Sequence, residues 1–397
     1  MRFPWLILLY LFFPVVALAQ NGIITGTVTN ADTKKPLPRA SVFLSSSSAG
    51  TATAENGTFT LSGLRPGQYT LVVSILGYEQ YSKTILVGRE PIKLDIELAQ
   101  KPLMLREVVI SSDADWRKNY AEFRKEFIGT DDNAKNCLVV NPHILNLTYN
   151  PTKQLLHADA DEFLVVENKA LGYRVKFLIN DFKIDKISNI ISREGQQVFE
   201  ELPGNEAQKK KWHQKREEAY YGSAMHFYRS LYADKLTEEG FQIFKLIRHL
   251  DPKRPDDEVI RRKYQIFREQ RKADSTNYYV ELSKASKYIN ESLVKPAYMP
   301  FEILSRSSEP GIYNVHFPNY LYVVYTKKRE EVDYKDIYRE LNMPNYQISV
   351  VTIQRHNSSY DIDMNGIVID NAPLYEGSWS KSRLSDMLPV DYVPDEK

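Results

Sequence analysis

Residues 55–71 read ENGTFTLSGLRPGQYTL, and this stretch decides the fold of the first part of the chain. The pair Asn56-Gly57 stands between two short alternating runs and predicts a β-hairpin, because a tight primed turn needs positive φ at its central residues. Residues 64–67, LRPG, predict a second turn, in which proline fixes φ and glycine is free to adopt the left-handed region. The stretch therefore predicts short β-strands joined by tight turns.

The same pattern of strands and turns extends from residue 22 to residue 99. Residues 31–38, ADTKKPLP, are rich in turn-forming residues and predict a loop. Seven short strands in about ninety residues predict a Greek-key β-sandwich. The predicted strands are residues 23–29, 41–44, 51–53, 59–61, 69–76, 81–87 and 92–98.

Several short segments of this part carry a resemblance to a known family. They are residues 26–28, 36–40, 55–59, 64–69 and 77–78. As a set they resemble the carboxypeptidase-like regulatory domain, a transthyretin-like β-sandwich that follows the zinc domain of some metallocarboxypeptidases. The family also occurs in TonB-dependent receptors and other envelope proteins of Bacteroidetes-type bacteria. The resemblance implies a module without catalytic residues, followed by an apolar exit strand at residues 103–110.

Residues 1–19 have the features of a signal peptide. Arg2 is the only charged residue, an apolar stretch runs from residue 3 to residue 18, and Ala17-Leu18-Ala19 fits the pattern that precedes a cleavage site. The stretch is short for a membrane-spanning helix and two prolines interrupt it, and an uncleaved anchor is the alternative. We therefore expect an exported protein that lies in the periplasm or is associated with the outer membrane.

Charge and cysteine content narrow the class of protein. The chain has 52 Lys and Arg against 51 Asp and Glu, and this balance argues against a nucleic-acid-binding protein. A chain of 397 residues is long enough for about two or three domains. Cys137 is the only cysteine, so an internal disulfide is excluded, and we interpret it as a small buried hydrophobic residue rather than a nucleophile.

The remainder of the chain predicts helices as well as strands. Aromatic residues at helical spacing predict a helix over residues 114–127, after a helix start at residues 111–113. A longer helix is predicted over residues 205–236, and residues 261–272 form a charged segment. Short gaps between the strands favour antiparallel pairing. The predicted strands are residues 144–149, 155–160, 163–166, 172–182, 197–202, 241–247, 321–326 and 348–355.

These patterns together predict a mainly β protein with α. An N-terminal Greek-key, transthyretin-like β-sandwich precedes a larger α+β domain with an antiparallel sheet. The expected boundaries are a signal peptide at 1–19, the regulatory β-sandwich at 20–100, an exit strand and linker helix at 101–136, and the α+β domain at 137–397.

Stretches of the α+β domain also resemble the uncharacterised region that follows this module in related envelope proteins. They are residues 199–202, residues 220–231 with Gly222, Ser223, His226, Phe227 and Arg229, residues 239–241 and residues 376–392. This resemblance implies a shared architecture, and no activity follows from it.

The name of the regulatory family makes a zinc peptidase the first chemistry to test. A metallocarboxypeptidase needs a His and a Glu three residues apart, plus a distant His. The residues three positions after the seven histidines are Asn146, Ala160, Arg216, Arg229, Pro252, Asn319 and Ser359, and none is Glu. The sequence also lacks the Gly-x-Ser-x-Gly, phosphate-loop and dinucleotide motifs. We therefore predict no cofactor, no metal and no zinc peptidase activity.

One pair of residues suits nucleophilic catalysis. Ser223 and His226 are three positions apart and would share a face of the predicted helix, with Gly222 and Arg229 close by. A nucleophile and base would also need an orienting carboxylate and an oxyanion hole. A serine and a half-buried histidine that satisfy backbone groups are the alternative. Gly222, Ser223, His226 and Arg229 are thus candidate binding residues, and no catalytic residue is assigned.

An acidic stretch, two basic clusters and the many tyrosines can each be interpreted as functional or as structural features. Residues 159–162, DADE, suit a hard cation or a solvated strand end, and they lack the glycine of a calcium loop. The basic clusters at 209–216 and 261–272 suit peripheral contact with anionic lipid or lipopolysaccharide, or form solvated helix faces. The 26 tyrosines suit a carbohydrate or peptide groove, or half-buried strands.

These observations favour a non-enzymatic protein of the cell envelope. In this hypothesis the sandwich is an interaction module, and the α+β domain binds an envelope protein or a surface polysaccharide. One alternative is an enzyme of unfamiliar type that uses the helix around Ser223 and His226. Another is an outer-membrane-associated barrel or receptor accessory component. The sequence leaves the partner and the oligomeric state open.

Overall fold

A computed structural model describes residues 22–101, 112–330, 344–354 and 357–395 of the chain. The predicted signal peptide (1–19) and exit strand (103–110) lie outside the described residues. The structure is 41% strand and 25% helix, with several antiparallel sheets, which confirms the predicted mainly β fold with α. Among the described helices, none is both long enough and apolar enough to cross a membrane.

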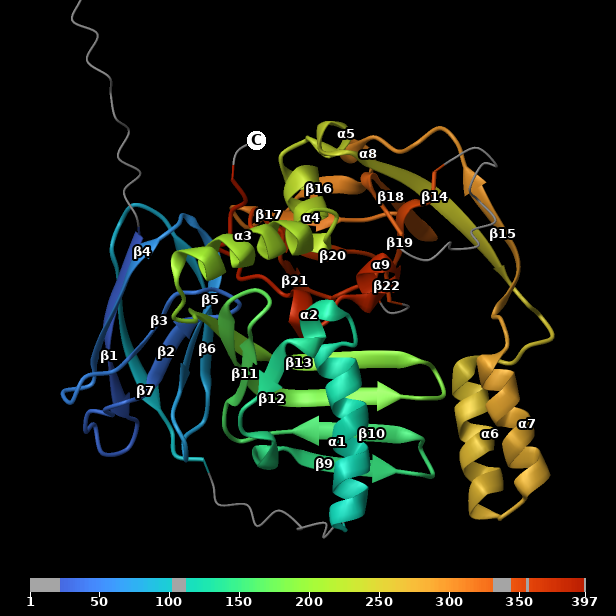
Figure 1. Cartoon of the computed structure of the whole chain (residues 1–397), viewed down its shortest axis with the longest axis horizontal. Coiled ribbons are helices and arrows are strands. Elements are labelled where there is room, and N and C mark those ends of the chain that lie inside the picture. The colour runs from blue at the N-terminus through green and yellow to red at the C-terminus, as the bar shows by residue number, and fades with distance from the viewer. Residues whose placement is uncertain (1–21, 102–111, 331–343, 355–356, 396–397) are drawn as a thin grey trace, which may run out of the picture.

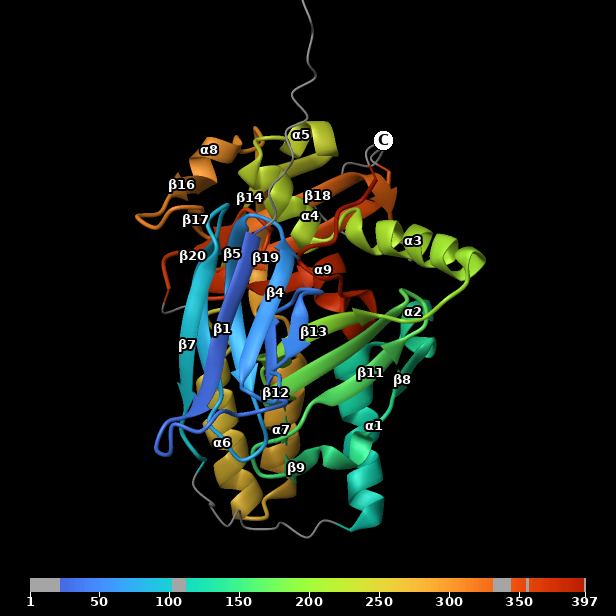
Figure 2. The same cartoon turned by 90° about the vertical axis from the view of Figure 1, so that its left-hand side faces the viewer.

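Seven strands form the β-sandwich at the blue end of the chain (Figures 1 and 2). One sheet has the order β4-β1-β7 and the other the order β3-β2-β5-β6. Alternation along the strands buries residues such as Ile24, Val42 and Leu71 completely between the sheets. Gly57 has a φ of 77°, as the predicted Asn56-Gly57 turn requires. The strands are β1 (Gly22–Asn30), β2 (Ser41–Leu44), β3 (Gly50–Ala52), β4 (Thr58–Leu64), β5 (Gly67–Ser74), β6 (Tyr81–Val87) and β7 (Ile92–Leu98).

A six-stranded antiparallel sheet, here called the central sheet, follows the sandwich. Its longest strand is β12 (Tyr173–Asp185), which pairs along one edge with β10 and β11 and along the other with β13 (Ile190–Glu201). Helix α1 (Asp113–Ile128) crosses one face of this sheet (Figure 1), where Phe127 packs edge-to-face on the rings of Phe177 and Phe182. The other strands are β8 (Cys137–Val139), β9 (Asn146–Asn150), β10 (Leu155–Asp159) and β11 (Leu164–Asn168), with the short helices α2 (Asp132–Lys135) and η1 (Pro142–Ile144) near β8.

Two further sheets complete the chain. The larger, here called the distal sheet, has the order β15-β14-β18-β19-β22, and the smaller has the order β16-β17-β20-β21. Buried residues of both sheets, including Ile243, Val315 and Tyr360, form one core with helix α4 (Ala224–Tyr232). The strands are β14 (Phe241–Leu250), β15 (Tyr288–Val294), β16 (Leu304–Arg306), β17 (Ile312–Val315), β18 (Tyr320–Arg329), β19 (Tyr346–Thr352), β20 (Tyr360–Asp363), β21 (Val368–Asp370) and β22 (Leu374–Gly377).

The prediction of one continuous helix over residues 205–236 is wrong. The chain forms α3 (Glu206–Tyr220), α4 and α5 (Leu236–Glu239) instead. Gly222 interrupts the helix with a φ of 86°, and the side chain of Ser223 then caps the start of α4. Aromatic spacing continued across this break, so the periodicity alone could not reveal it.

The charged segment at 261–272 belongs to a helical hairpin that the sequence did not predict as such. It consists of α6 (Asp257–Glu269) and α7 (Ala273–Lys284), which stand beside the central sheet in Figure 1. Tyr264 is buried and donates a hydrogen bond to the carbonyl of Pro151, 3.2 Å away. The remaining short helices are α8 (Pro300–Ile303), α9 (Ser378–Lys381) and η2 (Leu384–Asp386).

Candidate functional site

The loop after β2 joins the sandwich to the free edge of β13. The Ser46 N–H donates to the Gln197 carbonyl (2.7 Å), and the Phe199 N–H donates to the Ser47 carbonyl (2.9 Å). Ser47 and Val198 thus form a parallel β-bridge. Because these are main-chain hydrogen bonds between secondary-structure elements, the sandwich extends the central sheet at this point.

Apolar side chains reinforce this junction. Phe43 and Val72 of the sandwich pack with Leu178 and Val198 of the central sheet, and all four are buried. The Phe43 ring also meets the Phe163 ring edge-to-face, with 5.7 Å between centroids. Phe43 points away from the core of its own sandwich, whereas its neighbours in β2 point into it. The contact therefore contributes to docking rather than to the internal packing of the sandwich.

The C-terminal tail, residues 387–395, forms the third part of the junction. The Val390 N–H donates to the Ser46 carbonyl (2.7 Å), and the carboxylate of Asp391 accepts from the Ser48 N–H (2.9 Å) and from the Ser48 hydroxyl. The side chain of Val390 is buried against the sandwich core. The tail thus lies between the sandwich and the rest of the chain.

Arg229 of α4 holds this tail in place. Its guanidinium donates to the carbonyls of Asn365 (2.9 Å), Tyr392 (2.9 Å) and Val390 (2.7 Å). The same group lies over the ring of Tyr220, 5.5 Å from its centroid. A planar group with several fixed donors suits three carbonyls at once. Through Val390, the hydrogen bonds of Arg229 are linked to the sandwich loop.

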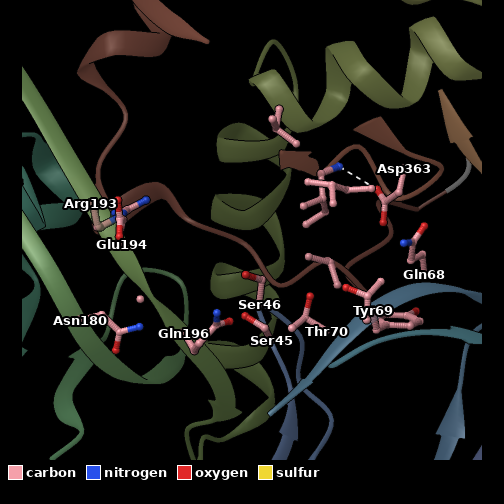
Figure 3. Close-up of a pocket in the computed structure, with 16 residues that line it drawn as sticks. Ser45, Ser46, Gln68, Tyr69, Thr70, Asn180, Arg193, Glu194, Gln196 and Asp363 are labelled. Atoms are coloured by element: carbon pink, nitrogen blue, oxygen red, sulfur yellow. Dashed lines mark hydrogen bonds between the residues drawn. The ribbon is translucent and has the colours of Figure 1, made fainter. Parts of the chain in front are cut away.

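A cavity of about 490 Å³ lies where these three parts meet (Figure 3), and we call it the junction cavity. In Figure 3, Asn180, Arg193, Glu194 and Gln196 of the central sheet lie opposite Gln68, Tyr69 and Asp363. Most of its lining is polar, with amides, hydroxyls and three ionisable side chains beside a tyrosine. The lining residues are Ser45, Ser46, Gln68, Tyr69, Thr70, Thr84, Asn180, Arg193, Glu194, Gly195, Gln196, Asp363, Ile367, Val368, Ile369 and Val390.

The polar side chains of the cavity differ in how many hydrogen bonds or ion pairs they form with the rest of the protein. Asp363 accepts hydrogen bonds from the backbone N–H groups of Asn365 and Ile367, both at 2.9 Å. Burial raises the pKa of Asp363 to about 6. The side-chain oxygen of Gln68 is buried and accepts no hydrogen bond from any described residue. Arg193 stacks on Phe127 and Phe177 and forms no ion pair with a described residue. The cavity therefore retains unused hydrogen-bonding capacity.

The four candidate residues from the sequence lie together on or before α4, and none of them lines the junction cavity. His226 is 2% exposed, in an aromatic cage of Tyr220, Tyr221, Phe241 and Tyr325. Its Nδ1 accepts from the Gly222 N–H (3.1 Å), so the proton of the neutral ring is on Nε2, 3.1 Å from Glu239. Burial lowers the pKa of His226, which is therefore neutral at neutral pH.

Ser223 has a structural partner other than the imidazole. Its hydroxyl oxygen accepts from the backbone N–H of His226 (3.1 Å) as the N-cap of α4. Gly222 has no room for a side chain, because a Cβ would lie 2.7 Å from the Tyr325 ring. The predicted one-face arrangement of Ser223 and His226 on a continuous helix is therefore wrong, and the geometry favours a structural role for this cluster.

The capping role of Ser223 can be tested by substitution. We expect Ser223→Ala to lower the free energy of unfolding by about 1 kcal/mol, because an orphan N–H at the helix start loses its acceptor. Ser223→Asp supplies another acceptor and should retain nearly all of the stability. Chemical denaturation of the three proteins measures both effects. Equal losses for both variants would contradict the capping role.

Asp386 gives the fold a pH dependence that can be isolated. Burial, followed by the charge of Asp131, raises the pKa of Asp386 to about 6, above its ordinary value. Between about pH 4 and pH 6 the folded state binds more protons at this carboxyl than the unfolded state, so its contribution to stability falls as pH rises. We expect Asp386→Asn to raise the free energy of unfolding by about 1–3 kcal/mol at about pH 7.5 and to change it little near pH 4.

The measurement for Asp386 is denaturant unfolding of wild type and variant at both pH values. Asn can still accept the hydrogen bond from the Asn133 side chain, which is 2.9 Å from Asp386 Oδ1. An equal loss of stability at both pH values would contradict the assignment of a destabilising charge.

The other sequence candidates have partners within the fold. Asp161 pairs with Lys101 (2.8 Å), and residues 161 and 162 line a second cavity of about 530 Å³. Among the described residues, no three His, Cys, Asp or Glu side chains are placed to hold a metal ion. Cys137 is buried, as predicted, and burial raises its pKa to about 12.

Residues of the basic clusters form ion pairs within the fold, and several of the tyrosines form hydrogen bonds with one another. Lys209, Lys215 and Arg216 form ion pairs with Glu206, Glu218 and Glu201, and Arg261 pairs with Asp185. Tyr228 is buried and its hydroxyl lies 3.0 Å from the hydroxyls of both Tyr360 and Tyr375. These tyrosines therefore pack the core and do not line a groove.

Comparison with known proteins identifies the first part of the chain. Residues 24–110 match the CarboxypepD_reg-like domain family, so the chain carries a carboxypeptidase-like regulatory domain, as its sequence resemblance implied. Comparison with curated proteins found no match.

The chain is also similar over part of its length to several solved structures, of which three are described. The pilus 2b backbone protein of group B streptococcus is 20% identical, with 21% of this chain and 42% of that chain covered and a TM-score of 0.19. BcpA, the major pilin subunit of Bacillus cereus, is 17% identical, with 21% and 31% covered and a TM-score of 0.18. A putative carbohydrate binding protein from Bacteroides uniformis is 8% identical, with 39% and 57% covered and a TM-score of 0.18. This chain spans less than two thirds of the length of each of these proteins.

The sequence did not predict the junction cavity. Its lining comes from segments as distant as residues 45 and 390, and no short motif joins them. The one local signal was the run of four serines at residues 45–48, which carries docking contacts in the structure.

Proposed function

We propose that this chain is an exported, non-enzymatic binding protein of the cell envelope, whose ligand site is the junction cavity. The main support is that the sandwich, the central sheet and β20 each contribute polar side chains to one cavity of about 490 Å³, to which the tail adds the apolar Val390. The regulatory domain then acts as a structural wall of the site. The partner in this proposal is an envelope protein or a surface polymer.

Two features support a binding role over catalysis. Ser223 caps the start of α4 and His226 is enclosed by aromatic rings, and both residues lie outside the cavity. Open polar groups such as Gln68 and Arg193 within the cavity suit reversible hydrogen bonding to a ligand.

A photo-crosslinking amino acid at position 84 tests the binding role in the native cell. Thr84 is exposed on β6 and lines the cavity, whereas Ser82 is exposed on the same face of the same strand and does not line it. We expect a discrete adduct from position 84 that is absent from position 82. Equal labelling at both positions, or none at either, would contradict the proposed site.

The proposed location is tested by cell fractionation. A freely diffusing periplasmic protein should be released with the periplasmic fraction. A protein associated with the outer membrane should be recovered with the membranes and released from them by a high-salt or carbonate wash. Recovery in the cytoplasmic fraction would contradict export.

A further inference from the structure

One edge of the junction cavity is an unpaired strand edge. The main-chain groups of Gln197 and Phe199 point away from β12, because they bind the sandwich loop. The direction of the main-chain N–H and C=O groups alternates along a strand, so those of Gly195 and Arg193 also point away from β12. Both residues belong to the stretch of β13 that lines the cavity. The register shift in this ladder lies on β12, between Ile179 and Asp181, and leaves the alternation of β13 uninterrupted.

These two residues present two N–H donors and two carbonyl acceptors to the cavity. Among the described residues, no main-chain hydrogen bond outside the β12 ladder reaches either of them. The neighbouring Ser47–Val198 bridge demonstrates that this edge accepts another strand-like segment. An extended peptide can therefore continue the edge where the sandwich loop leaves it.

Arg193 adds a charge requirement. Its guanidinium stacks on the rings of Phe127 and Phe177, 5.9 and 5.6 Å from the centroids, which fixes its position. The residue keeps some contact with solvent, but packing against the rings desolvates the guanidinium, and together with the charge of Arg383 this lowers the pKa of Arg193 to about 10. It therefore remains a cation at neutral pH. Side chains alternate along β13, so Glu194 leaves the strand on the face opposite to Arg193 although both line the cavity, and Asp363 is already bonded to its own loop. A carboxylate on the ligand would supply the missing counter-charge.

The same lining disfavours a saccharide. Sugar rings are commonly held against exposed aromatic faces. Among the described residues that line the cavity, Tyr69 is the only aromatic one, and it is 5% exposed. We propose that the junction cavity binds an extended peptide segment that pairs with β13 at residues 193–195 and places a carboxylate on Arg193. This inference rests on the proposed function and names the ligand class of the same site.

Phage-displayed random peptides selected on the full mature protein provide the probe, with synthesised winners measured by calorimetry. We expect selected peptides to share an acidic residue. Arg193→Met keeps the stacking but removes the charge and should weaken binding at least tenfold, whereas Arg193→Lys should weaken it far less. Arg262→Met, at an exposed position of α6 outside the cavity, is the matched control and should leave binding within about twofold.

Main-chain pairing has its own signature. Methylating the peptide nitrogens one at a time should abolish binding at alternate positions only, because every second N–H of a paired strand faces its partner. Thr84→Trp, which fills the cavity, should abolish binding, and Ser82→Trp should not. Circular dichroism and thermal unfolding establish that each variant is folded.

Three outcomes would overturn the inference. One is that no peptide is enriched on the wild-type protein relative to the Thr84→Trp protein. Another is a set of peptides whose affinity is the same for wild type and Arg193→Met, and the last is tolerance of methylation at every position. If the cavity cross-links a polysaccharide in the cell while no peptide binds, the proposed function stands and this inference fails. If position 84 captures nothing, the proposed function itself fails.

Discussion

Replacing Arg229 with alanine is expected to lower the free energy of unfolding by about 3–4 kcal/mol, because three carbonyls lose a charged donor at once. The carbonyls belong to Asn365, Val390 and Tyr392, which lie in two different segments of the chain. Arg229→Lys retains the charge but not the planar fork of donors, so we expect an intermediate loss. Urea denaturation of the three proteins measures the differences.

The loss should be local as well as global. Val390 connects the Arg229 guanidinium to the Ser46 carbonyl, so Arg229→Ala should free the tail and accelerate hydrogen exchange at the Val390 N–H. Arg262→Ala on the exposed face of α6 is the matched control and should change stability by less than about 0.5 kcal/mol. Unchanged exchange at Val390 in Arg229→Ala would contradict the role of this residue in holding the tail.

Phe43→Ala is the second variant for which we expect a large effect, a loss of about 3 kcal/mol. The ring is 1% exposed and lies between Val72 of the sandwich and Leu178 and Val198 of the central sheet. Its removal leaves a cavity at the junction while the internal core of the sandwich, with Val42 and Leu44, stays intact. The sandwich should therefore remain folded but dock less tightly.

Hydrogen exchange separates these two consequences. The N–H groups of Ser46, Phe199 and Val390 cross the junction and should lose protection in Phe43→Ala, while N–H groups within β1 and β4 should keep theirs. Leu86→Ala, at a site that is 53% exposed on β6, is the control. Uniform loss of protection throughout the sandwich would show that Phe43 supports its core, contrary to this account.

The sequence predicted the sandwich well because its signals are local. Asn56-Gly57 and residues 64–67 specify turns within a few residues, and strand alternation then fixes which side chains are buried. Helix α1 was likewise predicted within a residue at each end, since its aromatic stripe and its cap at Ser112 are both local. Such features need no knowledge of distant contacts.

The site could not be predicted in the same way, because it depends on long-range packing. Nothing near Phe43 in the sequence indicates that its ring faces another sheet, and nothing near Arg229 indicates that its partners lie beyond residue 364. His226 illustrates the converse error. A histidine close to a serine suggests chemistry, yet a glycine turn and four aromatic rings give it a buried structural position. Residue type alone does not distinguish these environments.

The regulatory sandwich is fixed to the rest of the chain and thereby forms one wall of the junction cavity. Electron paramagnetic resonance between spin labels tests it most directly, with cysteines introduced at the exposed Ser62 of β4 and Lys211 of α3. The native Cys137 is 6% exposed and should not react with the label. We expect one narrow distance distribution in the otherwise unaltered protein and a broader one in Phe43→Ala. A broad or multiple distribution in the otherwise unaltered protein would contradict it.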